Sequence, residues 1–171
     1  LAWLEEAANA HPEIRPLALR RSAEKAAREG DHTRAKELVE AARAEAHRAS
    51  DPISDALALS TKGALALYRG DWMEADRALA DARGKLEGTQ GVDAEELARL
   101  HHNLGVVALY QGRNDAAAYA LRESLDAKRA LGDSAGVRAC LLNLGLALAR
   151  AGKLDESERA LEEAAALARS L

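Results

Sequence analysis

Four glycines recur along the chain at nearly constant spacing, and they constrain the fold more than any other feature. Gly30, Gly70, Gly112 and Gly152 are separated by 40, 42 and 40 residues. A repeat of this length indicates stacked copies of one supersecondary unit. Arrays of this kind typically present extended surfaces for binding. The glycine ladder therefore predicts a repeat protein with a binding role.

Composition narrows the secondary structure and the class of partner. The 171 residues contain three prolines and no phenylalanine, with many alanines and leucines, so helix is strongly favoured. The net charge of −4 gives no global attraction to nucleic acid or to an anionic membrane. Cys140 is the only cysteine, which excludes an internal disulfide and fits a reducing compartment. There is no apolar stretch of membrane-spanning length and no signal-peptide pattern, so we predict a cytoplasmic protein.

Residues around each ladder glycine also recur. Small residues lie five positions after it, namely Ala35, Ala75, Ala117 and Ser157. Larger apolar residues lie nine positions after it, namely Val39, Leu79, Leu121 and Leu161. Small residues lie seven positions before it, namely Ala23, Gly63, Gly105 and Gly145. The offsets of five and nine differ by four and share a helix face, so they predict close contact between neighbouring helices.

Each ladder glycine is predicted to occupy the turn between two antiparallel helices, because glycine tolerates the positive φ that commonly ends a helix. The expected helices span 16–29, 33–49, 52–69, 72–86, 94–111, 114–131, 134–151 and 154–170. Asp51, Asp71, Asp93 and Asp133 are the expected N-caps. The chain is then one domain over 1–171, with repeats at 14–51, 52–92, 93–132 and 133–171. Residues 1–13 are expected to be the end of a preceding repeat and its link, in a longer protein.

This pattern resembles the tetratricopeptide repeat. The stretches NLGVVALYQGRNDAAAYALRESL and NLGLALARAGKLDESERALEEAA match its small, Gly, Ala, apolar and Ala positions best. The period near 40 residues is similar to the long-helix subtype of kinesin light chains, LGN-type adaptors and bacterial regulators. The resemblance implies an all-α, right-handed α-solenoid of about four helix pairs plus a leading partial helix. It also implies that the first helix of each pair lines a concave groove.

Groove positions carried over from the family nominate the partner-binding residues. They are Arg20, Arg21, Arg28, Ser60, Tyr68, His102, Asn103, Tyr110, Asn143 and Arg150. The two asparagines either bond the backbone of a bound peptide or are tied to their own fold. Arg20, Arg21 and Arg28 either accept an acidic ligand or pair with Glu24 and Glu29 along the helix. The two tyrosines either anchor a ligand or pack between repeats.

Chemistry-bearing patterns are otherwise missing from the sequence. His101 and His102 are adjacent and point about 100° apart on a helix, so they do not form a metal site. Catalytic motifs and phosphate-binding loops are absent, and no cofactor or enzymatic activity is expected. The leading prediction is a scaffold or adaptor that binds a protein or peptide, with no nucleic-acid partner and no membrane insertion. The alternative is a regulatory segment of a larger bacterial signalling or transcription protein that self-associates through its terminal helices.

Overall fold

The computed structural model describes residues 11–170, and every regular element in that range is helical. A short 3₁₀ helix, η1 (Pro12–Ile14), is followed by the α-helices α2 (Arg15–Arg28), α3 (His32–Arg48), α4 (Pro52–Tyr68), α5 (Trp72–Leu86), α6 (Ala94–Tyr110), α7 (Asn114–Ala130), α8 (Ser134–Arg150) and α9 (Leu154–Ser170). The predicted all-α repeat fold is confirmed. The helix expected over the first ten residues lies outside the described range.

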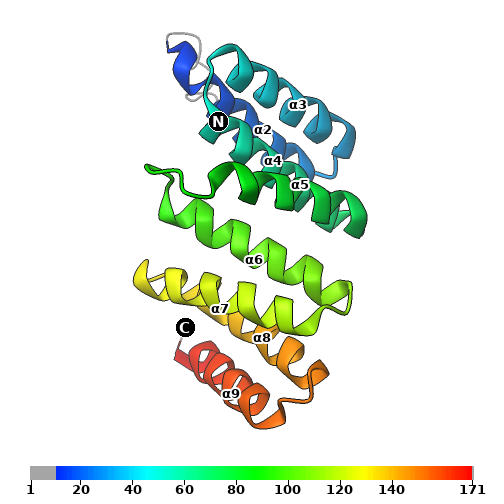
Figure 1. The fold of residues 1–171 in the computed structure, drawn as a ribbon, viewed down its shortest axis with the longest axis vertical. Coiled ribbons are helices and arrows are strands. Elements are labelled where there is room, and N and C mark those ends of the chain that lie inside the picture. The colour runs from blue at the N-terminus through cyan, green and yellow to red at the C-terminus, as the bar shows by residue number, and fades with distance from the viewer. Residues whose placement is uncertain (1–10, 171) are drawn as a thin grey trace. The chain divides into compact units, whose positions relative to one another are not determined.

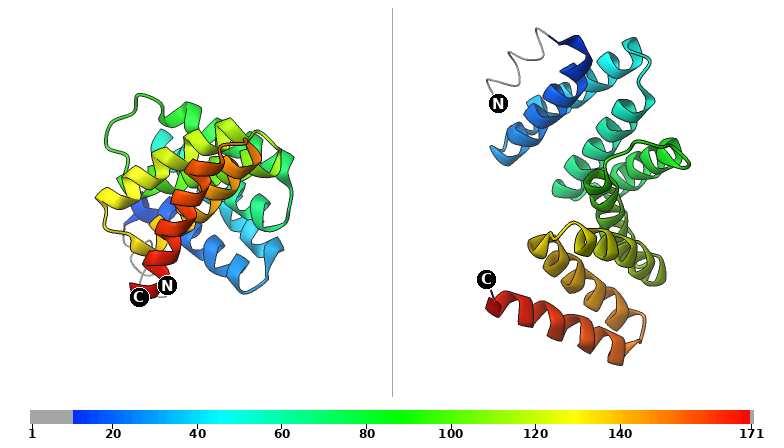
Figure 2. Two further views of the ribbon diagram at one scale, coloured as in Figure 1. Left: turned by 90° about the horizontal axis from the view of Figure 1, so that it is seen from below. Right: turned by 90° about the vertical axis from the view of Figure 1, so that its left-hand side faces the viewer.

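The chain divides into two compact units, Leu1–Gly91 and Val92–Leu171. The division falls inside the connector that the sequence placed between repeats two and three. In unit 1, α2 pairs with α3 and α4 with α5, and α4 also contacts both helices of the first pair. Unit 2 repeats this arrangement with α6, α7, α8 and α9, as the antiparallel pairs in Figures 1 and 2 show. The single repeat domain over 1–171 stays a prediction.

The helix ends follow the predicted punctuation. The ladder glycines all have positive φ, between 74° and 85°. The side chain of Asp51 accepts a hydrogen bond from the Ser54 amide at 3.0 Å, and Asp133 accepts one from Gly136 at 2.8 Å. Asp71 and Asp93 cap α5 and α6 in the same way. A glycine thus closes the first helix of each pair, and an aspartate starts several of the next helices.

Small residues bring the two helices of a pair together at one register, which we call the close-packing position: Ala23, Gly63, Gly105 and Gly145. A Cβ added to Gly145 would lie 2.7 Å from Leu161 Cγ on α9. The core of unit 2 is a cluster of leucines and alanines from α6 to α9, including Leu121, Leu141 and Leu148. In unit 1, Val39 packs with Ala23 and Leu65. The predicted close contact between paired helices is confirmed.

In one turn, a residue other than glycine adopts the positive φ of the ladder glycines. Ser50 has φ 55° and follows α3, where its amide donates to His47 O at 3.1 Å. Gly132 occupies the equivalent turn after α7 with φ 70°. A residue with a side chain pays about 1–2 kcal/mol to adopt this left-handed conformation. That cost exceeds the extra conformational entropy that a glycine loses on folding.

We therefore expect Ser50→Gly to raise the free energy of unfolding by about 0.5–1 kcal/mol. Ala49→Gly is the matched control, because Ala49 has a right-handed conformation with φ −80°. Glycine at this position should lower the free energy of unfolding. Urea unfolding of both variants, followed by circular dichroism, measures the difference. Loss of stability in Ser50→Gly would contradict this account of the turn.

Candidate functional site

The first helix of each pair presents one stripe of side chains away from its second helix. Relative to the close-packing position, the stripe comprises the residues at −2, +1 and +5, which lie about 100–160° away around the helix. In unit 1 the stripe is Arg21, Glu24 and Arg28 on α2, and Thr61, Ala64 and Tyr68 on α4. In unit 2 it is Asn103, Val106 and Tyr110 on α6, and Asn143, Leu146 and Arg150 on α8. Each unit therefore carries its own candidate face.

The structure corrects the placement of three nominated groove residues. Arg20, Ser60 and His102 all lie three positions before the close-packing residue, only about 60° from it around the helix. Arg20 and Ser60 are accordingly buried, and His102 is partly buried. These side chains face packed helices, so they are not available as an open lining of the groove.

Polar groups on the stripe of unit 1 already have partners inside the chain. Arg21 donates to Glu24 Oε2 at 3.1 Å, and Arg20 lies 3.7 Å from Glu24 Oε1. The Thr61 hydroxyl is buried and donates to Leu57 O at 3.1 Å. The intrahelical pairing expected as the alternative for these arginines is thus observed, while Arg28 is exposed.

The stripe of unit 2 differs because its two side-chain amides have no partner among the described residues. Asn103 and Asn143 occupy the same register on α6 and α8, which contact each other, and both are partly exposed. Within residues 11–170, neither amide makes a side-chain hydrogen bond. We call these two residues the amide pair. Within the described residues, the two asparagines are therefore not hydrogen-bonded to their own fold, which was the alternative to peptide binding.

The same stripe of unit 2 carries exposed apolar and aromatic side chains. Tyr110 is 60% exposed, and Leu146 is 43% exposed. Tyr68 on unit 1 is 80% exposed, so neither tyrosine is packed away between repeats. Arg150 is exposed and donates to Leu109 O at 3.3 Å, near the end of α6. This face of unit 2 combines free amides with open apolar surface, which suits an extended ligand.

His102 belongs to a buried polar contact instead. Its Nδ1 lies 3.2 Å from Cys140 Sγ on α8, and Sγ lies 3.3 Å from Ser124 Oγ on α7. Ser124 donates to Ala98 O at 2.7 Å. Burial, helped by the charge of Lys128, lowers the pKa of His102 from 6.5 to about 4, and burial raises the pKa of the Cys140 thiol. Cys140 is fully buried, and its hydrogen-bonding neighbours were not predicted.

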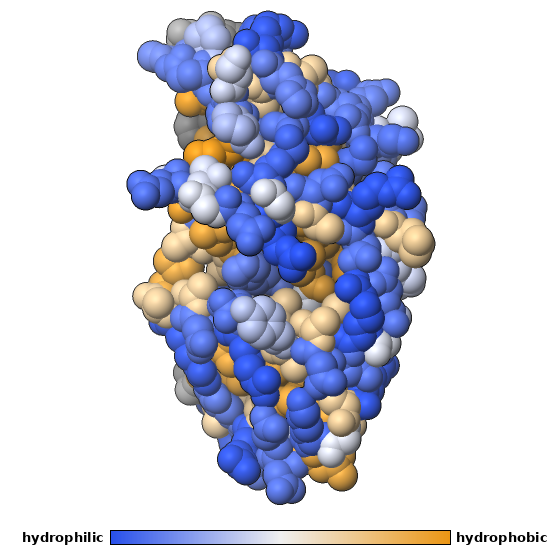
Figure 3. Space-filling view, in the orientation of Figure 1, coloured by the Kyte–Doolittle hydropathy of each residue, from blue (hydrophilic) through white to orange (hydrophobic). Residues whose placement is uncertain are grey.

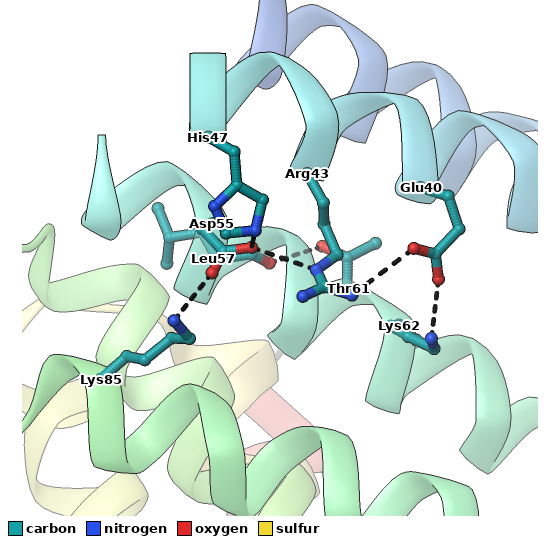
Figure 4. Close-up of polar contacts among 8 residues, drawn as sticks. All are labelled: Glu40, Arg43, His47, Asp55, Leu57, Thr61, Lys62 and Lys85. Carbon is teal, nitrogen blue, oxygen red and sulfur yellow. Dashed lines mark hydrogen bonds and ion pairs between the residues drawn. The ribbon is translucent and has the colours of Figure 1, made fainter. Parts of the chain in front are cut away.

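The sequence reasoning also missed a charged network in unit 1, shown in Figure 4. Asp55 on α4 is buried, yet Oδ1 lies 3.1 Å from Arg43 Nε and 3.4 Å from His47 Nε2, and Oδ2 lies 3.0 Å from Lys85 Nζ. Burial acts to raise the pKa of Asp55, but the bonds from Lys85 and Arg43 prevail and lower it. Nearby, Lys62 donates to Glu40 at 2.6 Å and lowers the pKa of Glu40. The cations come from α3 and α5, so no local sequence pattern could have revealed them.

The described residues also bear on metal binding and membrane insertion. No group of three or more histidine, cysteine, aspartate or glutamate side chains in the described part of the chain is arranged to hold a metal ion. None of the described helices combines the length and apolar character needed to cross a bilayer.

Comparison with known proteins identifies the repeat. Residues 54–130, from α4 to α7, match the sequence profile of the tetratricopeptide repeat. Residues 54–130 therefore contain tetratricopeptide repeats. Tetratricopeptide repeats generally mediate protein–protein interaction and are typically non-catalytic.

A solved structure has the same fold. The crystal structure of BtubC (BKLC) from P. vanneervenii aligns with a TM-score of 0.78 over 93% of this chain, at 18% identity. The chain spans 65% of the length of BtubC. Among curated proteins, none matches this chain in sequence. At this level of identity the likeness to BtubC concerns the fold alone.

Proposed function

We propose that this tetratricopeptide repeat protein is a non-catalytic scaffold whose α6–α8 face binds an extended segment of a partner protein. The amide pair is the observation that carries the proposal. Two partly exposed amides lie at one register on neighbouring helices, and neither has a side-chain partner within residues 11–170. An unpaired amide supplies both a donor and an acceptor, the two groups that an extended backbone needs. A cytoplasmic location agrees with the single, buried thiol of Cys140.

The spacing of the amide pair fits this ligand. Packed helices lie about 8–10 Å apart, and an extended chain advances about 3.3 Å per residue. A peptide crossing from α6 to α8 would therefore meet the second amide about three residues after the first. Its side chains would reach the exposed surface of Leu146, with Tyr110 at one margin. A regulatory, self-associating segment of a larger bacterial protein, the alternative from the sequence, stays a prediction.

The test is substitution of the amide pair followed by direct binding. Partners would be captured from cells that express the full-length protein, and peptides tiling each partner would be titrated against it. We expect Asn103→Ala and Asn143→Ala each to weaken the best peptide by about tenfold, the worth of one hydrogen bond near 1.4 kcal/mol.

Matched controls separate the face from the fold. Tyr119 on α7 is 68% exposed but lies on a second helix, so Tyr119→Ala should leave binding unchanged while Tyr110→Ala weakens it. Circular dichroism checks that each variant is folded. Peptides that bind equally well to wild type and to the doubly substituted amide pair would refute the proposed face.

A further inference from the structure

The second helix of the last pair, α9, exposes an apolar stripe with two acidic residues beside it. Leu154 is 66% exposed and Leu161 is 42% exposed, and Ala165 continues the stripe. Glu158 and Glu162 lie among these residues and are also exposed. We call these five residues the outer face of α9. Figure 3 shows mainly hydrophilic residues in this region, with an apolar patch at the beginning of α9.

The same register is covered by a helix elsewhere in each unit. Val39 on α3 is 1% exposed and packs against Leu65 of α4, and Leu121 on α7 is fully buried in the cluster that it shares with α8. Leu161 contacts its own first helix at Gly145, as Leu121 contacts Gly105, but the other side of Leu161 is open. The comparison indicates that a helix fits the outer face of α9.

The charges on α9 indicate what kind of helix would bind to its outer face. Glu156 and Glu163 on α9 accept hydrogen bonds from Arg122 and Arg129 of α7, each at 2.6 Å. Glu158 and Glu162, in contrast, make no ion pair with any residue between 11 and 170. At the equivalent positions α7 has Ala118 and Arg122. Two unpaired carboxylates beside an apolar stripe favour a partner with Lys or Arg flanking its apolar residues.

We propose that the outer face of α9 binds an amphipathic helix of a partner protein. That helix has apolar residues three and four positions apart, as Val137, Cys140 and Leu144 are on α8, and basic residues on either side of them. Packing ridges of one helix into grooves of the other would cover Leu154 and Leu161. This surface is separate from the amide pair, so it does not depend on the proposed peptide site.

Three synthetic peptides of about 18 residues serve as probes, a length at which a helix forms on binding. One has leucines at helical spacing among lysines, the second has glutamates in place of the lysines, and the third is the lysine peptide in scrambled order. Each is titrated against the full-length protein by NMR. We expect the lysine peptide to shift amides of α9, and the other two to bind at least about tenfold more weakly.

Charge reversal tests the recognition without touching the core. Glu158→Lys with Glu162→Lys should reverse the preference between the lysine and glutamate peptides, and Leu154→Ser should weaken the lysine peptide. Higher salt should weaken it as well. Equal binding of the scrambled peptide, or shifts confined to other helices, would overturn the proposal. So would dimerisation that protects α9 in sedimentation and hydrogen-exchange experiments, or protection of α9 by another segment of the full-length chain.

Discussion

Replacing Gly105 by valine is expected to lower the free energy of unfolding of unit 2 by about 3 kcal/mol. A Cβ at this position would lie 2.6 Å from Leu121 Cγ, 3.0 Å from Leu121 Cδ2 and 3.3 Å from the carbonyl oxygen of Ala117. Leu121 has no room to retreat, because it is fully buried in the core that it shares with α8. The whole of α7 would have to move away from α6. The small gain from removing a helical glycine does not offset that strain.

Gly84 provides the matched control. It also lies inside a helix, α5, but a Cβ added there meets no atom within 4 Å. Gly84→Ala should therefore stabilise unit 1 by about 1 kcal/mol, the difference in helix propensity between the two residues. Two glycines within helices are thus expected to respond in opposite directions.

Urea unfolding followed through assigned amide resonances of each unit measures both effects. Gly105→Ala adds an intermediate case, since one methyl group meets Leu121 without the second branch of valine. If Gly105→Val were as stable as the wild type, the contact between Gly105 and Leu121 would not hold the pair together. The close-packing role that the repeat pattern assigns to this register would then be wrong.

The sequence predicted helix ends well because they depend on local chemistry. Turn glycines and aspartate caps act within a few residues, and each predicted helix agrees with the structure to within about one residue at either end. Ser50 shows the limit of this reasoning, because a residue other than glycine adopts the same left-handed turn there. The close-packing glycines were also predictable, since they recur with the ladder.

The orientation of the groove residues was less predictable. Offsets along the sequence assigned Arg20, Ser60 and His102 to the groove, but a position 60° from the close-packing residue is on the boundary between the two sides of a helix. Whether such a side chain is buried or faces the groove depends on the neighbouring helix, as the contact between His102 and Cys140 shows. Contacts such as that of Asp55 with Lys85 join residues 30 positions apart, and only the fold brings them together.

Unit 2 is expected to lose stability as the pH falls from 7 to 5, and His102 is expected to cause about 2 kcal/mol of that loss. The pKa of His102 is about 4 in the folded chain because burial disfavours its charged form, against 6.5 in the reference state. The unfolded chain therefore binds the proton more readily than the folded chain between these two values. The stabilising contribution of the neutral ring is complete above pH 6.5, declines below it, and changes no further below about pH 4.

His102→Gln removes the titrating group while keeping a polar side chain beside Cys140. The variant is expected to be less stable than the wild type at pH 7, because the contact at 3.2 Å with Cys140 Sγ is altered. Its free energy of unfolding should nevertheless change about 2 kcal/mol less than that of the wild type between pH 7 and pH 5. His32→Gln, at an exposed position on α3, controls for loss of a histidine elsewhere. Urea unfolding at several pH values decides the matter, because parallel curves for His102→Gln and wild type would show that the ring is already hydrated in the folded chain.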